Sequence, residues 1–408
     1  MKYYNYRFPA IFIVILLYSN IAFAMAKASI FVTNETPQKP EYGFAFLGDM
    51  HFDKLHHHDM GWVKDKHPGD VLQIENYSNV TRQNTPALLK SVSSSLTKQN
   101  IPTFAIIQGG DFVEGLCGNY ELQVLQFKEA IDLVEQSTAS IPFLITKGNH
   151  DITGPGADKA YSGIMLPWLG KQLDTTITDT SYYVEHKSDL FIFFDSYKPD
   201  LDWFSKVLEQ HQARYVFFVI HKPVIPYNAR AQWHIFSKDN DRLKREKLLF
   251  LLGKHHAIVL SGHLHHYSVL RRKTEGGFIV QLSMNSVIDI SESKVELLEG
   301  IDEYTPELVD LEASFSTKEK DTCRELLEKE KPFIDYFELA KTPCYSLMKV
   351  SDNHIDIDTR LRSSQTAWRR LRIERATLNI TKIDCNLTNQ FMTMKRLNQE
   401  YNDNKQTK

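Results

Sequence analysis

The chain has 408 residues, of which 42% are hydrophobic and 24% charged, the proportions of an ordinary globular protein. This length allows one large domain or two medium-sized domains. The formal net charge is only −3, so no global field would recruit nucleic acid or an anionic membrane, and composition argues against a polyanion-binding protein.

The first 24 residues have the three parts of a secretory signal peptide. Lys2 and Arg7 give a positive start, residues 8–17 are almost wholly apolar, and Ala22-Phe23-Ala24 is a pattern that signal peptidase accepts. The alternative is an uncleaved membrane anchor, but the apolar run is shorter than the ~20 residues of a membrane span. We predict cleavage near Ala24, a secreted or periplasmic protein, and no stable membrane span in the mature chain. Residues 25–40 are predicted to be a linker.

Apolar runs alternate with amphipathic stretches in the first half of the predicted core, residues 41–294. Strands are predicted at 42–47, 102–107 and 141–145, and helices at 86–96 and 122–134. Such alternation is typical of βαβ units and of a parallel sheet.

The pattern continues toward the carboxyl terminus. We predict a hairpin at 181–185 and 190–194, helices at 201–208 and 243–252, and strands at 215–220, 257–260, 267–270 and 277–282. Residues 295–343 are acidic and polar and are predicted to form a helical insertion. Two alternating stretches around the turn-forming Ser351-Asp352-Asn353 assign residues 344–376 to strands that complete the core. Residues 377–408 are predicted to be a polar tail.

Five short motifs carry carboxylate, amide or imidazole groups, and nearly every one follows a predicted strand. They are Asp49-Met50-His51, Gly110-Asp111-Phe112-Val113-Glu114, Gly148-Asn149-His150-Asp151, the isolated His221, and Gly262-His263-Leu264-His265. Each motif alone could be an ordinary turn, helix cap or strand end. The carboxyl ends of parallel strands share one edge of a sheet, however, so the five motifs should meet there. Together they predict a metal site.

The set resembles the calcineurin-like metallophosphoesterase family, over residues 42–282. The resemblance implies an α/β fold, a four-layer α/β/β/α sandwich, and two divalent cations such as manganese, iron or zinc. It implies that the carboxylate of Asp111 bridges the two cations. The other ligands would form one group for each cation: Asp49, His51 and His265, and Asn149, His221 and His263. A hydroxide held between the cations would attack phosphorus in line, because coordination lowers the pKa of water to about 7.

The resemblance also assigns roles to His150 and Glu114. The family uses the histidine of the third motif to protonate the leaving oxygen, and Glu114 stands where members often carry an aspartate that contacts this histidine. We therefore predict that Glu114 pairs with His150, although the glutamate side chain is one methylene longer than the aspartate of other members. No tyrosine stands at the Glu114 position, which argues against the purple acid phosphatase branch. Gly115 stands where protein phosphatases have an arginine, which argues against phosphoprotein substrates.

The predicted function is an exported phosphoesterase that hydrolyses a small-molecule phosphomonoester or phosphodiester. One alternative is a phosphodiesterase of nucleotides or phospholipid head groups. An alternative of another class is a catalytically inactive metal-binding module of the same fold. No nucleic acid partner is indicated.

Several other polar residues could contribute to the site or lie outside it. His56-His57-His58-Asp59 fits a solvated loop at the site rim better than a third metal site or a substrate contact. Arg271 and Arg272 fit either a phosphate clamp or the solvent side of a strand.

The four cysteines would occupy an oxidising compartment if the chain is exported. Three pairings are possible for Cys117, Cys323, Cys344 and Cys385. Cys323 with Cys344 is preferred because both flank the predicted insertion; buried free thiols are the alternative. None has CxxC spacing, which argues against a zinc-thiolate site.

Overall fold

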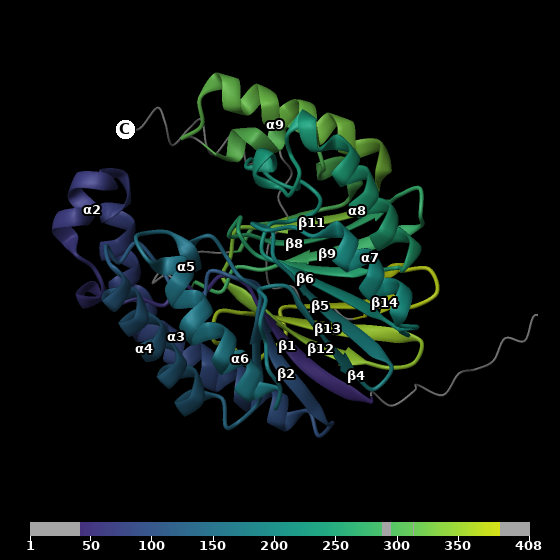
Figure 1. Cartoon of the computed structure of the whole chain (residues 1–408). Helices are drawn as coiled ribbons and strands as arrows, with labels where there is room; N and C mark the ends of the chain where they lie inside the picture. The colour runs from purple at the N-terminus through teal and green to yellow at the C-terminus, as the bar shows by residue number, and fades with distance from the viewer. Residues whose placement is uncertain (1–40, 288–294, 313, 384–408) are drawn as a thin grey trace, which may run out of the picture. The chain divides into compact units, whose positions relative to one another are not determined.

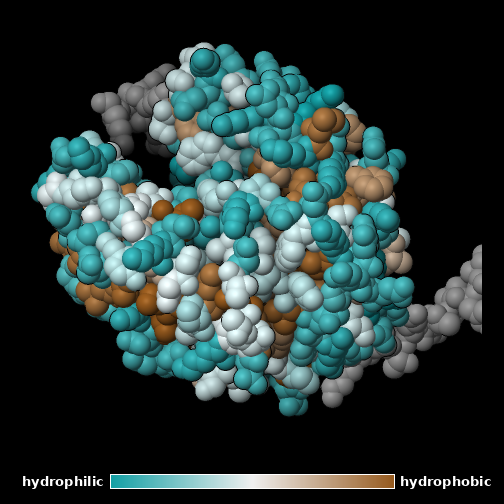
Figure 2. All heavy atoms as spheres, in the orientation of Figure 1, coloured by the Kyte–Doolittle hydropathy of each residue, from teal (hydrophilic) through white to brown (hydrophobic). Residues whose placement is uncertain are grey.

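The computed structural model describes residues 41–287, 295–312 and 314–383. The predicted signal peptide, the linker, Cys385 and most of the predicted tail lie outside the described residues. No described helix is long and apolar enough to cross a membrane. On the face drawn in Figure 2 the surface is mostly hydrophilic, and the hydrophobic residues lie in small groups.

The first sheet has the strand order β15-β14-β13-β12-β1-β2-β3. Its strands are β1 (Tyr42–Leu47), β2 (Thr103–Gln108), β3 (Phe143–Ile145), β12 (Cys344–Val350), β13 (His354–Leu361), β14 (Arg369–Glu374) and β15 (Ile380–Lys382). The first three strands are parallel, and β12 runs antiparallel to β1. The predicted late strands therefore do return to the sheet, beside its first strand.

The second sheet has the order β10-β11-β8-β9-β7-β6-β5-β4. Its strands are β4 (Tyr182–His186), β5 (Asp189–Phe194), β6 (Val216–Ile220), β7 (Ile258–Ser261), β8 (Tyr267–Lys273), β9 (Phe278–Ser283), β10 (Leu297–Glu299) and β11 (Ile334–Ala340). Strands β5, β6, β7 and β9 are parallel, and β4–β5 is the predicted hairpin. The parallel strands are buried on both faces, which is why they appear in the sequence as continuous apolar runs.

Helices cover the outer face of each sheet, so the predicted α/β/β/α sandwich is confirmed. The helices are α2 (Met60–Lys66), α3 (Val71–Lys98), α4 (Tyr120–Ser137), α5 (Ala157–Ala160), α6 (Leu166–Gln172), α7 (Leu201–Gln210), α8 (Arg242–Lys254) and α9 (Thr317–Glu330). Helices α3, α4 and α6 lie beside the first sheet, and α7 and α8 beside the second (Figure 1).

Aromatic rings hold the inner faces of the two sheets together. Phe44 of β1 meets Phe191 of β5 and Phe217 of β6 edge-on, with ring centroids 5.4 and 5.2 Å apart. Each such pair adds about 0.5–1.5 kcal/mol beyond the burial of its area. At the edge of this core the Tyr42 hydroxyl donates to Asp189 Oδ2 across the sheets, at 2.6 Å. The relative placement of the sheets is therefore specified by aromatic packing as well as by polar contacts such as this one.

Helix α3 begins much earlier than the predicted start at residue 86, and Pro86 lies inside it. Its first half has no apolar stripe because its inward face meets polar groups. Gln73 donates to Glu114, Ser78 donates to Asp53, and Thr81 accepts from the Asp53 backbone N–H. Hydrophobic periodicity therefore could not reveal this half of the helix.

The predicted helical insertion, residues 295–343, is helical only in part. Helix α9 lies within it, but β10 and β11 extend the second sheet, and β11 pairs antiparallel with β8. In β11, Phe337, Leu339 and Ala340 are buried, although an acidic residue lies between them. That residue, Glu338, is itself buried and accepts a hydrogen bond from the Tyr267 hydroxyl. The acidic character of this stretch is the reason that the sequence did not predict a strand inside the sheet.

The preferred Cys323–Cys344 disulfide is wrong for this structure. Both thiols are free and buried, as is Cys117. Cys323 lies on α9 and Cys344 starts β12 of the other sheet. The alternative of buried free thiols holds for these three cysteines.

A buried ion-pair cluster fastens the end of α9 to the second sheet. Glu330 lies 2.6 Å from both Arg245 of α8 and Arg272 of β8. Burial alone would raise the pKa of Glu330, but the two guanidinium groups lower it to about 2.

We predict that Glu330→Gln lowers the free energy of unfolding at pH 7 by about 3 kcal/mol, because two guanidinium groups lose their buried carboxylate. A lowered folded-state pKa stabilises the protein above the unfolded pKa. The difference from wild type should therefore be complete above about pH 4.5 and shrink as the pH falls toward 2. Urea unfolding at several pH values measures it.

Glu325→Gln is the matched control on the same helix, since Glu325 is exposed and lies 4.0 Å from Lys329. It should unfold like wild type. Equal stability of Glu330→Gln and wild type at pH 7, or a difference that grows on acidification, would contradict the assignment.

Candidate metal centre

The carboxyl ends of five parallel strands deliver the five motifs to one place. Residues Asp49, Asp111 and Asn149 follow β1, β2 and β3 of the first sheet, and His221 and His263 follow β6 and β7 of the second. Two short links join the sheets at this edge, a bridge between Asp49 and Asn285 and a hydrogen bond from the His263 N–H to Asp49 Oδ1, at 2.9 Å. The predicted convergence is therefore present.

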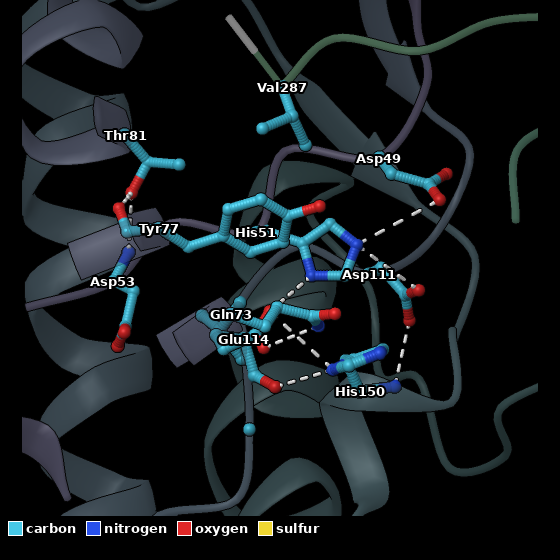
Figure 3. Close-up of polar contacts among 12 residues, drawn as sticks. Asp49, His51, Asp53, Gln73, Tyr77, Thr81, Asp111, Glu114, His150 and Val287 are labelled. Atoms are coloured by element: carbon cyan, nitrogen blue, oxygen red, sulfur yellow. Dashed lines mark hydrogen bonds and ion pairs between the residues drawn. The ribbon is translucent and has the colours of Figure 1, made fainter. Parts of the chain in front are cut away.

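The first group of side chains contains Asp49, His51, Asp111 and His265, whose candidate ligand atoms all lie within 4.8 Å of one another. His265 Nε2 lies 2.9 Å from Asp49 Oδ2 and 3.0 Å from His51 Nε2. His51 Nε2 is 3.6 Å from Asp111 Oδ2. Figure 3 shows His51 between Asp49, Asp111 and Glu114.

The second group contains Asp111, His221 and His263. His221 Nε2 lies 3.2 Å from Asp111 Oδ2 and 3.1 Å from His263 Nδ1. Asn149 belongs to the same place, since its Oδ1 is 3.1 Å from His221 Nε2. The carboxylate of Asp111 is thus shared by both groups.

Four of these residues have left-handed backbone, which is unusual for residues with a side chain. The φ angles are 43° for His51, 53° for Asp111, 73° for His263 and 54° for His265. Such conformations cost about 1–3 kcal/mol each and cluster at functional sites. Gly262 permits the close approach, because a Cβ there would overlap with Asp49 Oδ1.

Asp151 holds the loop of residues 110–114 in place, a role that the sequence did not reveal. Its buried carboxylate accepts the backbone N–H groups of Asp111, Phe112, Val113 and Gly148, at 2.8–3.2 Å. The second and third motifs are therefore fastened to each other. The Asp111 carboxylate in turn accepts the His150 N–H at 2.8 Å.

The electrostatics of the centre favour positive charge at this edge. Burial alone would lower the pKa values of His51 and His221. Glu114 beside His51, and Asp111 beside His221, instead raise each to about 9. Burial would raise the pKa of Asp111, but the neighbouring histidines hold it well below its usual range. Burial lowers the pKa values of His263 and His265, so their rings stay neutral and keep a lone pair.

The hydrogen bonds of the outer ring nitrogens fit a cation centre. His51 Nδ1–H donates to Glu114 Oε2 at 2.6 Å, and His221 Nδ1–H donates to the Gly109 carbonyl oxygen at 2.9 Å. Both acceptors leave the Nε2 atoms directed inward, the usual arrangement of metal-binding histidines. The Nε2 atoms of His51 and His265 are 3.0 Å apart, and such a pair repels unless a cation or a proton lies between the two atoms.

The predicted His150–Glu114 pair is only partly right. The Glu114 carboxylate contacts His51 at 2.6 Å and accepts from Gln73 at 2.8 Å, whereas His150 Nδ1 is 3.6 Å away from it. His150 Nδ1–H donates instead to the backbone oxygen of Glu114, at 2.7 Å. The longer side chain of glutamate reaches past His150 to His51, and the backbone orients His150.

A cavity of about 530 Å³ opens over the centre. Its wall includes parts of the candidate ligand set, His150, and a second set that sequence motifs did not identify: Gln73, Tyr197, Lys222, Arg230, Trp233 and Lys238. Tyr197 donates to Asn149 Oδ1 at 3.0 Å, so it orients that amide. Of this second set, the sequence could have pointed only to Lys222, because it directly follows the motif residue His221.

The other candidates lie away from this cavity or serve the structure. His57 and His58 are buried and contact the Asp53 carboxylate, so the expectation of a solvated loop is wrong for them. Asp59 caps α2. Arg271 pairs with Asp335 and Arg272 with Glu330, so neither arginine is a phosphate clamp.

Comparison with known structures gives matches to the fold at low sequence identity. A purple acid phosphatase from yellow lupin (Lupinus luteus) seeds matches with a TM-score of 0.50 and 12% identity, over 83% of this chain and 54% of that one. PhoD matches with a TM-score of 0.51 and 10% identity, over 91% of this chain and 78% of that one. This chain thus spans about half the length of the purple acid phosphatase. A search of curated protein sequences finds no match.

The sequence profile of the family described as calcineurin-like phosphoesterase matches residues 42–267. This range contains all five motifs and the strands that position them. The matched range covers more than half of the chain, and the structural likenesses agree with it in fold. The chain belongs to the calcineurin-like phosphoesterase family.

Proposed function

We propose that this protein is a metal-dependent phosphoesterase that uses two divalent cations to hydrolyse a small-molecule phosphate ester. The observation that supports the proposal most strongly is the Asp111 carboxylate, which two groups of metal-ligating side chains share. Asp49, His51 and His265 would hold one cation, and Asn149, His221 and His263 the other. Bound there, the cations would polarise the phosphoryl oxygens and lower the pKa of a coordinated water.

His150 is the proposed general acid. Its Nδ1–H is held by the Glu114 backbone oxygen, so a proton on Nε2 is the one that can be transferred. The ring lines the cavity, where a leaving oxygen would lie. Glu114 acts through His51, which it orients, so it is a positioning residue.

The first test removes the metal or its shared ligand. Treatment with a chelator should abolish hydrolysis of nitrophenyl phosphate and bis-nitrophenyl phosphate, and divalent cations should restore it. Asp111→Asn should lower kcat/KM by more than ~100-fold, because loss of even an outer-shell partner costs 10–100-fold. Bound metal, measured by elemental analysis, should fall with it.

Asp132→Asn, on the exposed side of α4, is the matched control and should keep both activity and metal. Undiminished hydrolysis after complete chelation would refute metal dependence. Full metal loading with no hydrolysis of any phosphate ester would favour an inactive binding module.

The second test concerns the acid. We expect His150→Ala to lower kcat on an alkyl phosphate by about 10²–10⁴-fold, because an alkoxide leaves only with a proton. Nitrophenyl phosphate should be affected far less, since nitrophenolate is a good leaving group. Steady-state kinetics on both substrates measures the contrast. Normal turnover of the alkyl phosphate would rule out the role of His150.

Export is a separate proposal that rests on the sequence of residues 1–24. Expression in a host with a secretory pathway should yield a protein that begins just after Ala24. The intact mass of the purified protein shows at which residue the mature chain begins. A purified protein that still contains Met1 would contradict cleavage.

A further inference from the structure

The cavity beside the metal centre has a wall whose charge the proposed chemistry does not use. The segment from Lys222 to Lys238 joins β6 to α8 and forms this wall. It carries two lysines, Arg230 and Trp233. Of the described residues that line the cavity, only Asp111 is acidic, and it belongs to the metal centre.

Lys222 and Lys238 bring uncompensated positive charge to the wall. No carboxylate of the described residues pairs with either ammonium group. Lys222 is half-buried, and its Nζ lies over the Tyr197 ring at 4.8 Å. A half-buried ammonium beside a second one is unfavourable unless an anion binds there.

Arg230 does not add to this charge, because Glu312 neutralises it. Its Nη2 lies 3.0 Å from Glu312 Oε2. The guanidinium group lies over the Trp233 ring at 5.0 Å and so holds the indole in place. Arg230 therefore acts as a positioning residue for Trp233.

Trp233 presents an aromatic surface at the mouth of the cavity. It is 37% exposed, and its ring centroid is 5.8 Å from that of His263, one of the candidate metal ligands. Within the described ranges, the other large aromatic side chains that are exposed, Tyr183, Phe250 and Phe333, do not line this cavity. An exposed indole next to a reacting centre is a platform on which a planar ring can stack.

From these contacts we infer that the substrate is nucleotide-like, with an aromatic ring that stacks on Trp233 and a second anionic group that binds Lys222. The inference rests on the proposed phosphoesterase function and names its substrate class. Lys238 would contribute to the same anionic subsite. The cavity volume of about 530 Å³ lies within the range of pockets for ligands of this size. In the reaction, water adds to phosphorus, the bond to the leaving oxygen breaks, and that oxygen takes up a proton.

The test compares substrates that differ by one of these features. Ribose 5-phosphate has neither, adenosine 5′-monophosphate has the ring, and adenosine 3′,5′-bisphosphate and adenosine 5′-diphosphate have the ring and a second anionic group. In wild type, kcat/KM should rise about tenfold or more from the sugar phosphate to the monophosphate. It should rise about tenfold again from the monophosphate to at least one of the two nucleotides that carry a second anionic group.

Two pairs of variants test which residue is responsible for each increase in kcat/KM. Lys222→Gln should remove most of the preference for the second anionic group, because Lys238 alone remains, and should leave the preference for the ring, whereas Lys222→Arg should keep both. Trp233→Leu should abolish the preference for the ring and leave the preference for the second anion, whereas Trp233→Phe should retain most of both. Because each preference is a ratio within one protein, loss of folded protein or of metal cancels.

Binding without catalysis provides an independent measurement. Titration calorimetry on chelator-treated protein should show the same order of affinities, because neither Lys222 nor Trp233 needs a cation to act. The inference is wrong if wild type hydrolyses nitrophenyl phosphate but shows no preference among the four substrates. It is equally wrong if either Lys222→Gln or Trp233→Leu keeps the preference assigned to it. A wild type that hydrolyses neither these substrates nor nitrophenyl phosphate would refute the phosphoesterase function itself.

Discussion

The structure depends on one buried carboxylate, that of Asp111, held in left-handed backbone between two sets of imidazole groups. Asp151 holds the loop by accepting its backbone N–H groups, and the His150 N–H donates to the carboxylate itself. So many carboxylates and imidazoles at one buried edge are stable only if positive charge lies among them. Protons can supply that charge, as the raised pKa values of His51 and His221 indicate, and the two proposed cations would supply it as well.

The arrangement of the sheets follows from the same requirement. The first sheet contributes Asp49, Asp111 and Asn149, and the second contributes the histidines at 221 and 263. Neither sheet alone has the complete set of proposed ligands. The packing of Phe44 against Phe191 and the links between the motif loops therefore position the site as well as stabilising the fold.

The sequence predicted those features that depend on local pattern. Parallel strands buried on both faces appear as apolar runs, and the motifs at their ends could be placed at one edge. Contacts between distant segments could not be predicted in this way. The first half of helix α3 was not predicted because its inward face is polar, and strand β11 was not predicted because acidic residues interrupt its apolar pattern. The Glu114 carboxylate contacts His51 and not the His150 side chain that the sequence predicted. Tyr197 and Trp233 follow no motif, and only the fold brings them to the cavity.

Anomalous diffraction from crystals of the protein loaded with manganese or zinc can test whether two cations share Asp111. We expect two anomalous peaks per chain, one on each side of the Asp111 carboxylate, with the histidines at 51 and 265 near one and those at 221 and 263 near the other. A single peak, or peaks away from Asp111, would contradict this expectation.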